Sequence, residues 1–268
     1  MSTPQVCILR APGTNCDEET AHAFTRAGAT AERLHVNRLL ESPRELERFQ
    51  ILCIPGGFSF GDDVGAGVLF GTRLRQELGE ALRQFLDRET LTLGICNGFQ
   101  VLVKAGILPS PGEFPSEQPR RLTLTWNTDG RYDTRWVTLR TVRPDSPFLR
   151  GIETLEVPMA HAEGRVVLSN DLSVSELLEN GQIALCYRGT EDDRPFAVGD
   201  AVLPQPANPN GSVANIAGLS SPDGRVLGLM PHPERFVDGT QHPQWTRREL
   251  PEEGAGLAMF RNAVNYFA

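Results

Sequence analysis

Residues 91–101, Leu-Thr-Leu-Gly-Ile-Cys-Asn-Gly-Phe-Gln-Val, constrain the fold of this chain more than any other segment. The first five residues form a short apolar run, which is typical of a buried strand. From Phe99 onward, apolar side chains recur at helical spacing, and Gly106 is placed to end the helix. The segment therefore predicts a sharp strand-to-helix turn with Cys96 at its tip.

The glycines on either side of Cys96 have the spacing of a nucleophile elbow. Gly94 and Gly98 flank the cysteine as glycines flank the reactive serine of such turns, and glycine suits a cramped turn with positive φ. A thiol at a helix N-terminus faces unpaired N–H groups, which favour the reactive thiolate. From this segment alone, a small buried cysteine that only fills space after a strand is the alternative.

The chain before this turn alternates between strand and helix patterns. Strands are expected at residues 6–9, 31–36 and 51–54, and helices at residues 17–27 and 74–86. Such alternation predicts a parallel sheet with right-handed crossovers. Because ligands bind outside the carboxyl ends of the strands in these sheets, we expect a site where loops 12–17 and 56–61 meet Cys96.

The second half of the chain has the pattern of antiparallel strands. They are expected at residues 121–126, 135–142, 155–159, 166–168 and 183–187, with a final hairpin of residues 213–219 and 225–230. A proline-rich loop or lid (107–119) and a turn-rich loop (204–212) connect these segments, and residues 255–267 form a closing amphipathic helix. No linker separates two cores, so residues 1–268 are expected to form a single domain.

The composition excludes several classes of protein. The formal net charge of −8 disfavours binding to nucleic acid. The 5 cysteines include no CxxC pair and follow no secretory signal, which indicates a reduced, cytoplasmic chain. No apolar run is long enough to span a membrane, and no Cys/His spacing resembles a zinc site, so no metal is expected.

The glycine-rich loop after residues 51–54 is a candidate oxyanion hole. Gly56 and Gly57 begin the run Gly-Gly-Phe-Ser-Phe-Gly, whose backbone N–H groups can point toward Cys96. Donors that are fixed before charge develops are what an oxyanion hole requires. A flexible glycine turn with no such role is the alternative, because glycine-rich turns are common at strand ends.

A histidine and a glutamate stand two residues apart in Met-Pro-His-Pro-Glu-Arg (230–235). Pro231 and Pro233 stiffen this segment and keep His232 out of the helical region, so the side chains of His232 and Glu234 are expected side by side. A carboxylate in that position orients the imidazole and stabilises its charged form. The alternative is a surface turn with a chance ion pair.

The other histidines and cysteines are weaker candidates. His161, in His-Ala-Glu-Gly-Arg, is the rival base, whereas His22 and His35 are expected on the surface and His242 lacks a carboxylate two residues away. Cys7, Cys53 and Cys186 lie in expected core strands and read as inert. The role of Cys16, in a loop at the same edge of the sheet, stays open.

Taken together, these segments resemble one family, the class I, triad-type glutamine amidotransferases. The triad resemblance rests on Gly-Ile-Cys-Asn-Gly-Phe-Gln (94–100) and Pro-His-Pro-Glu (231–234). Segments 11–17, 55–62, 161–165, 208–212 and 228–235 narrow the resemblance to glutaminase components of purine biosynthesis, in order and over nearly the whole chain. The resemblance implies a flavodoxin-like, open and mostly parallel sheet flanked by helices, with added antiparallel strands.

The resemblance also implies a mechanism. Cys96 would attack the carboxamide of glutamine and form a thioester, His232 would transfer protons, and Glu234 would orient the imidazole. Backbone N–H groups of Gly57 and Asn97 would hold the oxyanion. Phe58 and Gln100 match positions at the glutamine pocket of the family. His161, a further candidate for substrate binding, and loop 208–212 match family motifs that are expected to border the site or the contact with the synthetase.

The partner implied by the resemblance is a separate synthetase. That subunit would use ATP and Mg²⁺ to convert formylglycinamide ribonucleotide to formylglycinamidine ribonucleotide with the ammonia that this chain releases. A small accessory subunit is also expected, and no cofactor is expected in this chain itself. Because free ammonia release would waste glutamine, we expect assembly to gate the site.

Three other functions are compatible with part of the pattern. A free-standing cysteine hydrolase, such as a peptidase or deglycase, would act without a partner but leaves the additional motifs unexplained. A non-catalytic module would have no need for Cys96, His232 and Glu234 together. A glutaminase serving another nucleotide synthetase would not require the segments at 12–17 and 208–212.

Overall fold

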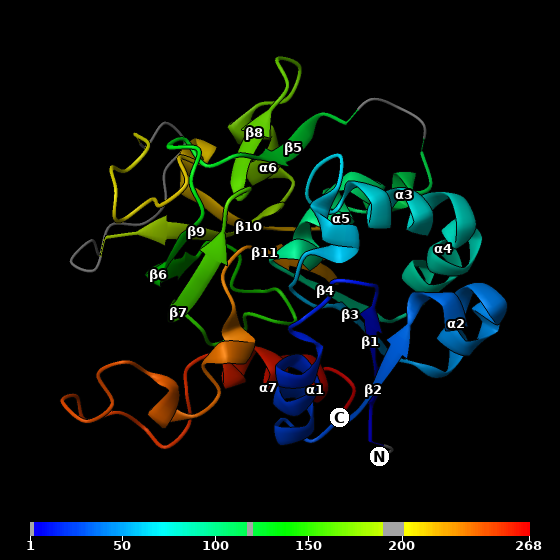
Figure 1. The fold of residues 1–268 in the computed structure, drawn as a ribbon, viewed down its shortest axis with the longest axis horizontal. Coiled ribbons are helices and arrows are strands. Elements are labelled where there is room, and N and C mark those ends of the chain that lie inside the picture. The colour runs from blue at the N-terminus through cyan, green and yellow to red at the C-terminus, as the bar shows by residue number, and fades with distance from the viewer. Residues whose placement is uncertain (1–2, 117–119, 190–200) are drawn as a thin grey trace.

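A nine-stranded sheet forms the centre of the computed structural model, which describes residues 3–116, 120–189 and 201–268. The strand order is β2-β1-β3-β4-β11-β10-β9-β6-β7, and β5 pairs with β8 in a separate two-stranded sheet (Figure 1). The strands are β1 (Gln5–Arg10), β2 (Thr30–His35), β3 (Ile51–Ile54), β4 (Leu91–Ile95), β5 (Leu122–Thr125), β6 (Asp133–Thr141), β7 (Thr154–His161), β8 (Arg165–Leu168), β9 (Ile183–Arg188), β10 (Ile216–Ser220) and β11 (Val226–Leu229).

Five of these strands run parallel to one another. β1 pairs with β2 and β3, β3 with β4, and β4 with β11, all in parallel. The order 2-1-3-4 followed by one further parallel strand is that of flavodoxin-like sheets. The predicted fold class is therefore confirmed, and the parallel strands place their carboxyl ends along one edge.

The antiparallel strands extend this sheet on the side of β11. β10 pairs antiparallel with β11 and β9, and β6 with β9 and β7. The predicted hairpin turn is present, since the N–H of Gly224 donates to the carbonyl of Ser221 at 2.9 Å and Gly224 has a φ of 78°. The return of β11 to the parallel half brings the segment with His232 beside the strand that precedes Cys96.

Helices cover both sides of the sheet. Figure 1 shows α1 and α7 on one side and α3, α4 and α5 on the other. The helices are α1 (Asp17–Arg26), α2 (Val36–Glu41), α3 (Val68–Glu77), α4 (Gly79–Asp87), α5 (Asn97–Ala105), α6 (Val174–Glu179) and α7 (Leu257–Asn265).

The expected single helix at 74–86 is wrong. The structure has two helices there, which meet at Leu78 and Gly79. The first begins earlier, at Val68, and Leu78 leaves the helical region with a φ of −119° and a ψ of 8°. The apolar spacing ran through this break because both helices turn apolar side chains toward the same core. The strand expected from residue 213 begins at Ile216, after a 3₁₀ turn.

The core is continuous across the described residues, and it contains the cysteines expected to be inert. Cys7, Cys53 and Cys186 are fully buried, and burial raises the pKa of the Cys7 and Cys53 thiols. All five cysteines are free thiols. Among the described residues, no helix has the length and apolar character needed to cross a bilayer. Pro119 of the expected proline-rich loop lies outside the described residues.

Candidate active site

The predicted elbow is present at Cys96. The residue caps α5 at its N-terminus with a φ of 51° and a ψ of −108°, a strained conformation for a side chain other than glycine. A Cβ on Gly98 would overlap the carbonyl oxygen of Ile54, and one on Gly94 would come within 2.6 Å of Leu102. The two glycines therefore permit the close packing of α5 on β3 and β4 that holds Cys96 at the turn.

The histidine segment enters from the neighbouring strand. β4 and β11 pair through Ile95 and Leu229, and the N–H of Cys96 donates to the carbonyl of Leu229 at 2.8 Å. Beyond β11, the N–H of His232 donates to the carbonyl of Pro158 on β7 at 2.8 Å. Backbone hydrogen bonds from two strands thus fix where His232 stands relative to Cys96.

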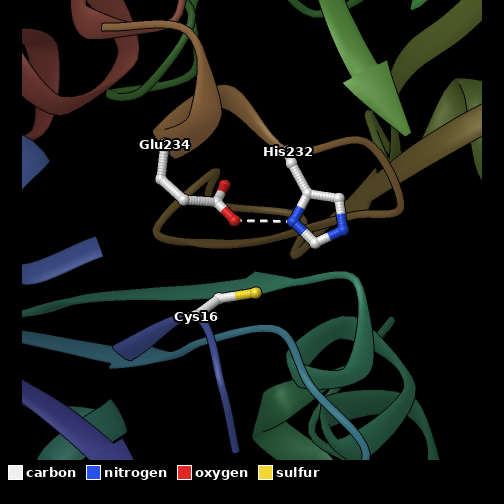
Figure 2. A group of neighbouring side chains, drawn as sticks. All are labelled: Cys16, His232 and Glu234. Atoms are coloured by element: carbon white, nitrogen blue, oxygen red, sulfur yellow. Dashed lines mark hydrogen bonds and ion pairs between the residues drawn. The ribbon is translucent and has the colours of Figure 1, made fainter. Parts of the chain in front are cut away.

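His232 and Glu234 form the expected pair. Nδ1 of His232 lies 2.6 Å from Oε1 of Glu234, and both side chains are buried (Figure 2). The extended backbone expected for this segment is only partly correct. His232 has a φ of −110° and a ψ of 85°, but Pro233–Arg235 forms one 3₁₀ turn. Because of that turn, the side chain of Glu234 lies against the imidazole.

The charge of Glu234 dominates the protonation of His232. Burial by itself would lower the pKa of the imidazole, but the carboxylate of Glu234 and the thiols of Cys96 and Cys16 raise this pKa well above its ordinary value. Nε2 has no hydrogen-bond partner among the described residues. The thiol of Cys96 is nevertheless close enough to the imidazole to influence its pKa. Catalytic hydrogen bonds are often long in the absence of substrate.

The loops predicted to meet at the edge of the sheet do so. Thr14 and Gly57 form an isolated bridge, and the N–H groups of Phe58 and Ser59 donate to the carbonyl of Gly13 and to Oδ1 of Asn97, respectively. Gly57 has a φ of 146°, and the loop leaves its N–H outside these bonds. The glycine run is therefore held rigidly beside the elbow, as an oxyanion hole requires.

The side chain of Asn97 organises one wall of the site. Its Nδ2 donates to Oδ1 of Asp62 and to Oε1 of Gln100, each at 3.0 Å. Nε2 of Gln100 in turn donates to the carbonyl of Glu163. Gln100 therefore joins α5 to the segment after β7, and its side chain is already bonded at both ends.

Asp62 was missed by the sequence reasoning. It lies in a strained segment, residues 60–67, where Phe60, Asp62 and Val64 all have φ between 54° and 69°. Burial and the nearby charge of Glu163 raise the pKa of Asp62 to about 6. Hydrogen bonds from Gly67 and Asn97 act in the opposite direction but are outweighed. The only signal in the sequence was the placement of Asp62 at the end of the glycine-rich run.

These walls enclose a cavity of about 40 Å³ next to Cys96. Larger hollows of about 770 and 570 Å³ lie elsewhere. The first is lined by residues within 43–47 and 77–88, the second by residues within 106–116, 120–121 and 169–182, and neither lining includes a candidate site residue. The lining of the small cavity is Gly57, Phe58, Asp62, Ala66, Cys96, Gln100, Ala160, His161, Ala162 and Glu163. All three expected pocket residues are therefore among those that line it.

His161 is buried and uncharged. Nδ1 lies 3.1 Å from Oδ1 of Asn127, which also accepts the N–H of Gly164 at 3.2 Å. Burial and the positive charge of His232 lower the pKa of His161 to about 3. Because Asn127 uses this oxygen as an acceptor, Nδ1 carries the proton and Nε2 keeps its lone pair. An imidazole of this basicity is a poor rival to His232 as a base.

The turn-rich loop 208–212 supports the segment with His161. Nδ2 of Asn210 donates to the carbonyl of Gly164 at 2.8 Å, and Oγ of Ser212 accepts the N–H of Val166 at 3.0 Å. These side chains are buried and face away from solvent. The loop therefore acts on the site indirectly, by fixing the backbone of residues 164–166.

The remaining histidines lie outside the cavity. His22 is exposed on α1, and Nδ1 of His35 accepts the N–H of Asn37 at the start of α2. His242 packs on Trp136, with the ring centroids 4.5 Å apart, and faces Glu156. None of the three lines the cavity beside Cys96.

Fold and site together define a class: an α/β protein with a cysteine at a nucleophile elbow, adjacent to a buried His–Glu pair. Residues 3–267 match the family described as a CobB/CobQ-like glutamine amidotransferase domain, and the chain belongs to that family. The expected family is thereby confirmed.

Individual proteins within and beyond this family are also similar to the chain. The phosphoribosylformylglycinamidine synthase subunit PurQ of Dehalococcoides mccartyi is 45% identical over 99% of this chain and 98% of that protein. PurQ of Methanococcus maripaludis is 36% identical over 98% of this chain and 97% of that protein. The solved structure of PurLQS from Thermotoga maritima superposes with a TM-score of 0.71 at 27% identity, covering 100% of both chains. A putative GMP synthase component from Thermoplasma acidophilum, at 11% identity over 99% of this chain and 94% of that one and a TM-score of 0.56, shares the fold alone.

Proposed function

We propose that this chain is the glutaminase subunit of a phosphoribosylformylglycinamidine synthase. It would hydrolyse glutamine to glutamate and deliver ammonia to a synthetase subunit in purine biosynthesis. The observation that carries this proposal is the 45% identity, over nearly the full length of both chains, to a protein with that name. The placement of Cys96 beside the His232–Glu234 pair supplies the chemistry that the activity needs.

The reaction would begin with attack of the Cys96 thiolate on the side-chain carbonyl of glutamine. His232 would protonate the departing ammonia, and Glu234, 2.6 Å from Nδ1, would hold the ring and stabilise its positive charge. A thioester on Cys96 would remain. Water activated by His232 would then release glutamate and restore the thiol.

Backbone N–H groups would stabilise the oxyanion formed in each step. Gly57 lines the cavity with Cys96, and Asn97 begins α5, where the first N–H groups of a helix have no intrahelical acceptor. The side chain of Asn97 accepts the N–H of Ser59 and so ties these two donors into one frame. Such fixed donors act without reorganisation when charge develops.

Glutamine would be held by the walls of the cavity. Phe58 and His161 would contact the substrate chain, while Gln100 would brace the wall through its bonds to Asn97 and Glu163. The carboxylates of Asp62 and Glu163 both line the cavity and would attract the α-ammonium group of glutamine. Burial and, secondarily, repulsion from Glu163 raise the pKa of Asp62, and the substrate charge would counteract both.

The partner would supply the rest of the reaction. We propose that a synthetase subunit uses ATP and Mg²⁺, that a small accessory subunit joins the complex, and that the complex works in the cytoplasm. Residues 1–268 would act as a single glutamine amidotransferase domain, in agreement with the family match over residues 3–267 and the continuous core. The solved complex named PurLQS supports a synthetase partner.

Reconstitution with the synthetase tests the proposal. Cys96→Ala should abolish glutamine-dependent formation of formylglycinamidine ribonucleotide and leave ammonia-dependent formation intact. Cys7→Ala, which removes a buried thiol of β1 that does not line the cavity beside Cys96, should retain both. If Cys96→Ala removes both activities equally in a folded complex, the assigned division of labour is wrong.

A further inference from the structure

The side chain of Cys16 takes no part in the proposed reaction, yet it faces the His–Glu pair. Cys16 caps α1 at its N-terminus and is 1% exposed, and its N–H donates to the carbonyl of Gly56 at 3.2 Å. One ligand atom each from Cys16, His232 and Glu234 lies within 4.8 Å of the other two. Figure 2 shows the sulfur of Cys16 beneath the imidazole and on the side of the carboxylate.

Gly56 permits the close approach of Cys16 and His232. A Cβ at Gly56 would come within 2.8 Å of Cε1 of His232 and within 3.0 Å of Sγ of Cys16. Burial raises the pKa of the Cys16 thiol, whereas His232 and Arg235, whose Nη2 donates to Sγ at 3.0 Å, lower this pKa. The ligand atoms of the three groups therefore converge, and the guanidinium beside Sγ offsets part of the cost of forming the metal-binding thiolate.

Two further atoms of this cluster lack protein partners. Oε2 of Glu234 and Nε2 of His232 are buried, and neither atom has a hydrogen-bond partner among the described residues. A buried carboxylate oxygen without a partner is costly, and a bound cation removes that cost. This second observation is independent of the convergence of the three side chains.

We propose that Cys16, His232 and Glu234 form a binding site for a thiophilic divalent cation, with Zn²⁺ as the ion whose ligand preferences fit them. Thiolate sulfur, imidazole nitrogen and carboxylate oxygen are the zinc ligands of proteins, and three of them leave one position for water. Binding forms one bond to each ligand atom. It releases the proton of the Cys16 thiol and the proton shared by His232 and Glu234 to solvent, with no change in oxidation state.

The ion would inhibit the proposed reaction, and this consequence rests on the proposed function. An imidazole that is bonded to a metal, and whose carboxylate partner is also a ligand, cannot transfer protons to and from Cys96 and the substrate. The sequence carried no local signal of such a site because its ligands come from the start of α1 and from the turn after β11.

Binding is tested in the Cys96→Ala chain, because a metal ion could otherwise use the thiol of Cys96. Titration of this variant with Zn²⁺ by calorimetry should give one site, and Co²⁺ in its place should give a thiolate-to-metal charge-transfer band. Adding Cys16→Ala should remove the site and the band, and adding Cys7→Ala should preserve both. Retention of the band in the Cys16→Ala background, or absence of binding in Cys96→Ala, would overturn the proposal.

A second variant and an inhibition assay complete the test of the metal site. If Cys16→Ala does not fold, as judged by circular dichroism, Glu234→Gln in the Cys96→Ala chain should weaken Zn²⁺ binding at least about tenfold. In the assembled enzyme, Cys16→Ala should raise the Zn²⁺ concentration for half-inhibition of glutamine hydrolysis at least about tenfold. If the Cys96→Ala chain binds Zn²⁺ through Cys16 but the assembled wild-type enzyme hydrolyses no glutamine, the proposed function is refuted and the metal site stands.

Discussion

The N–H of Cys96 donates to the carbonyl of Leu229 at 2.8 Å, three residues before His232 in the chain. This bond continues the parallel pairing of β4 and β11, in which Ile95 faces Leu229. The separation of Cys96 and His232 is therefore set by the register of two adjacent strands. A slip of one residue in that register would turn the imidazole to the opposite face of the sheet.

Replacement of Glu234 by Gln should slow glutamine hydrolysis by about 10²- to 10⁴-fold in kcat. The neutral amide keeps the shape but removes the charge that raises the pKa of His232, so this pKa should fall. Imidazole resonances followed by NMR across a pH series measure that shift. Glu156→Gln is a matched control, because Glu156 faces His242 at 3.5 Å outside the site. An unchanged His232 pKa would contradict the role of Glu234.

Replacement of Asp62 by Asn should raise the KM for glutamine by about tenfold or more, because a charge-assisted contact to the α-ammonium group is lost. The pKa of Asp62 is about 6, so the wild-type carboxylate is charged above this pH and neutral below it. The wild-type KM should therefore rise as pH falls through 6, and the variant should lack this dependence.

The thermal stability of Asp62→Asn distinguishes substrate binding by Asp62 from a purely structural role. A carboxyl group whose pKa is raised from 3.8 in the folded state destabilises the fold once it is ionised, that is, as pH rises through about 6. Asp62→Asn should therefore unfold at the same or a higher temperature than wild type at neutral pH. The exposed neighbour Asp63 provides the control, Asp63→Asn. A loss of stability in Asp62→Asn without a change in KM would refute substrate binding.

Replacement of Gly98 by Ala should destabilise the fold by about 3 kcal/mol or more, since the new methyl group would overlap the carbonyl of Ile54 on β3. Denaturant unfolding of the isolated chain measures this loss. Gly112→Ala is the matched control, because a Cβ there meets no atom within 4 Å. Equal stability of the two variants would show that the elbow tolerates a side chain.

Hydrolysis of glutamine by the isolated chain should be slower, by at least about tenfold, than by the complex with the synthetase. The cavity beside Cys96 has a volume of about 40 Å³, whereas whole ligands occupy pockets of roughly 300 Å³ or more. Entry of the complete substrate therefore requires the walls to move. Steady-state rates with and without the synthetase measure the effect, and equal rates would contradict gating by assembly.

The features that the sequence predicted well are those written in a few consecutive residues. Gly94, Cys96 and Gly98 specify the elbow because a cramped turn needs glycines at those positions, and Ser-Pro-Asp-Gly (221–224) specifies its hairpin turn in the same local way. His232 and Glu234 belong to this group too. Proline on both sides of the histidine fixed their relation, even though the turn at 233–235 is 3₁₀ rather than extended.

The features that were missed depend on contacts between distant segments. The break between α3 and α4 leaves the apolar spacing intact, so periodicity could not reveal it. Asp62 acquires its raised pKa from burial and from Glu163, which lies about a hundred residues further along the chain. Cys16 lies near His232 because the start of α1 and the turn that follows β11 are neighbours in space, although they are more than 200 residues apart in the chain.

The left-handed backbone at Phe60, Asp62 and Val64 concentrates conformational strain in one wall of the site. Each such residue holds about 1–3 kcal/mol of conformational free energy, and Val64 is 87% exposed at the surface. A second molecule that contacts Val64 would therefore touch the strained segment that supplies Asp62 and Ala66 to the cavity lining. The strands β4 and β11, whose register places Cys96 relative to His232, lie outside this segment, so a change in its conformation would alter the cavity wall and leave that register unchanged.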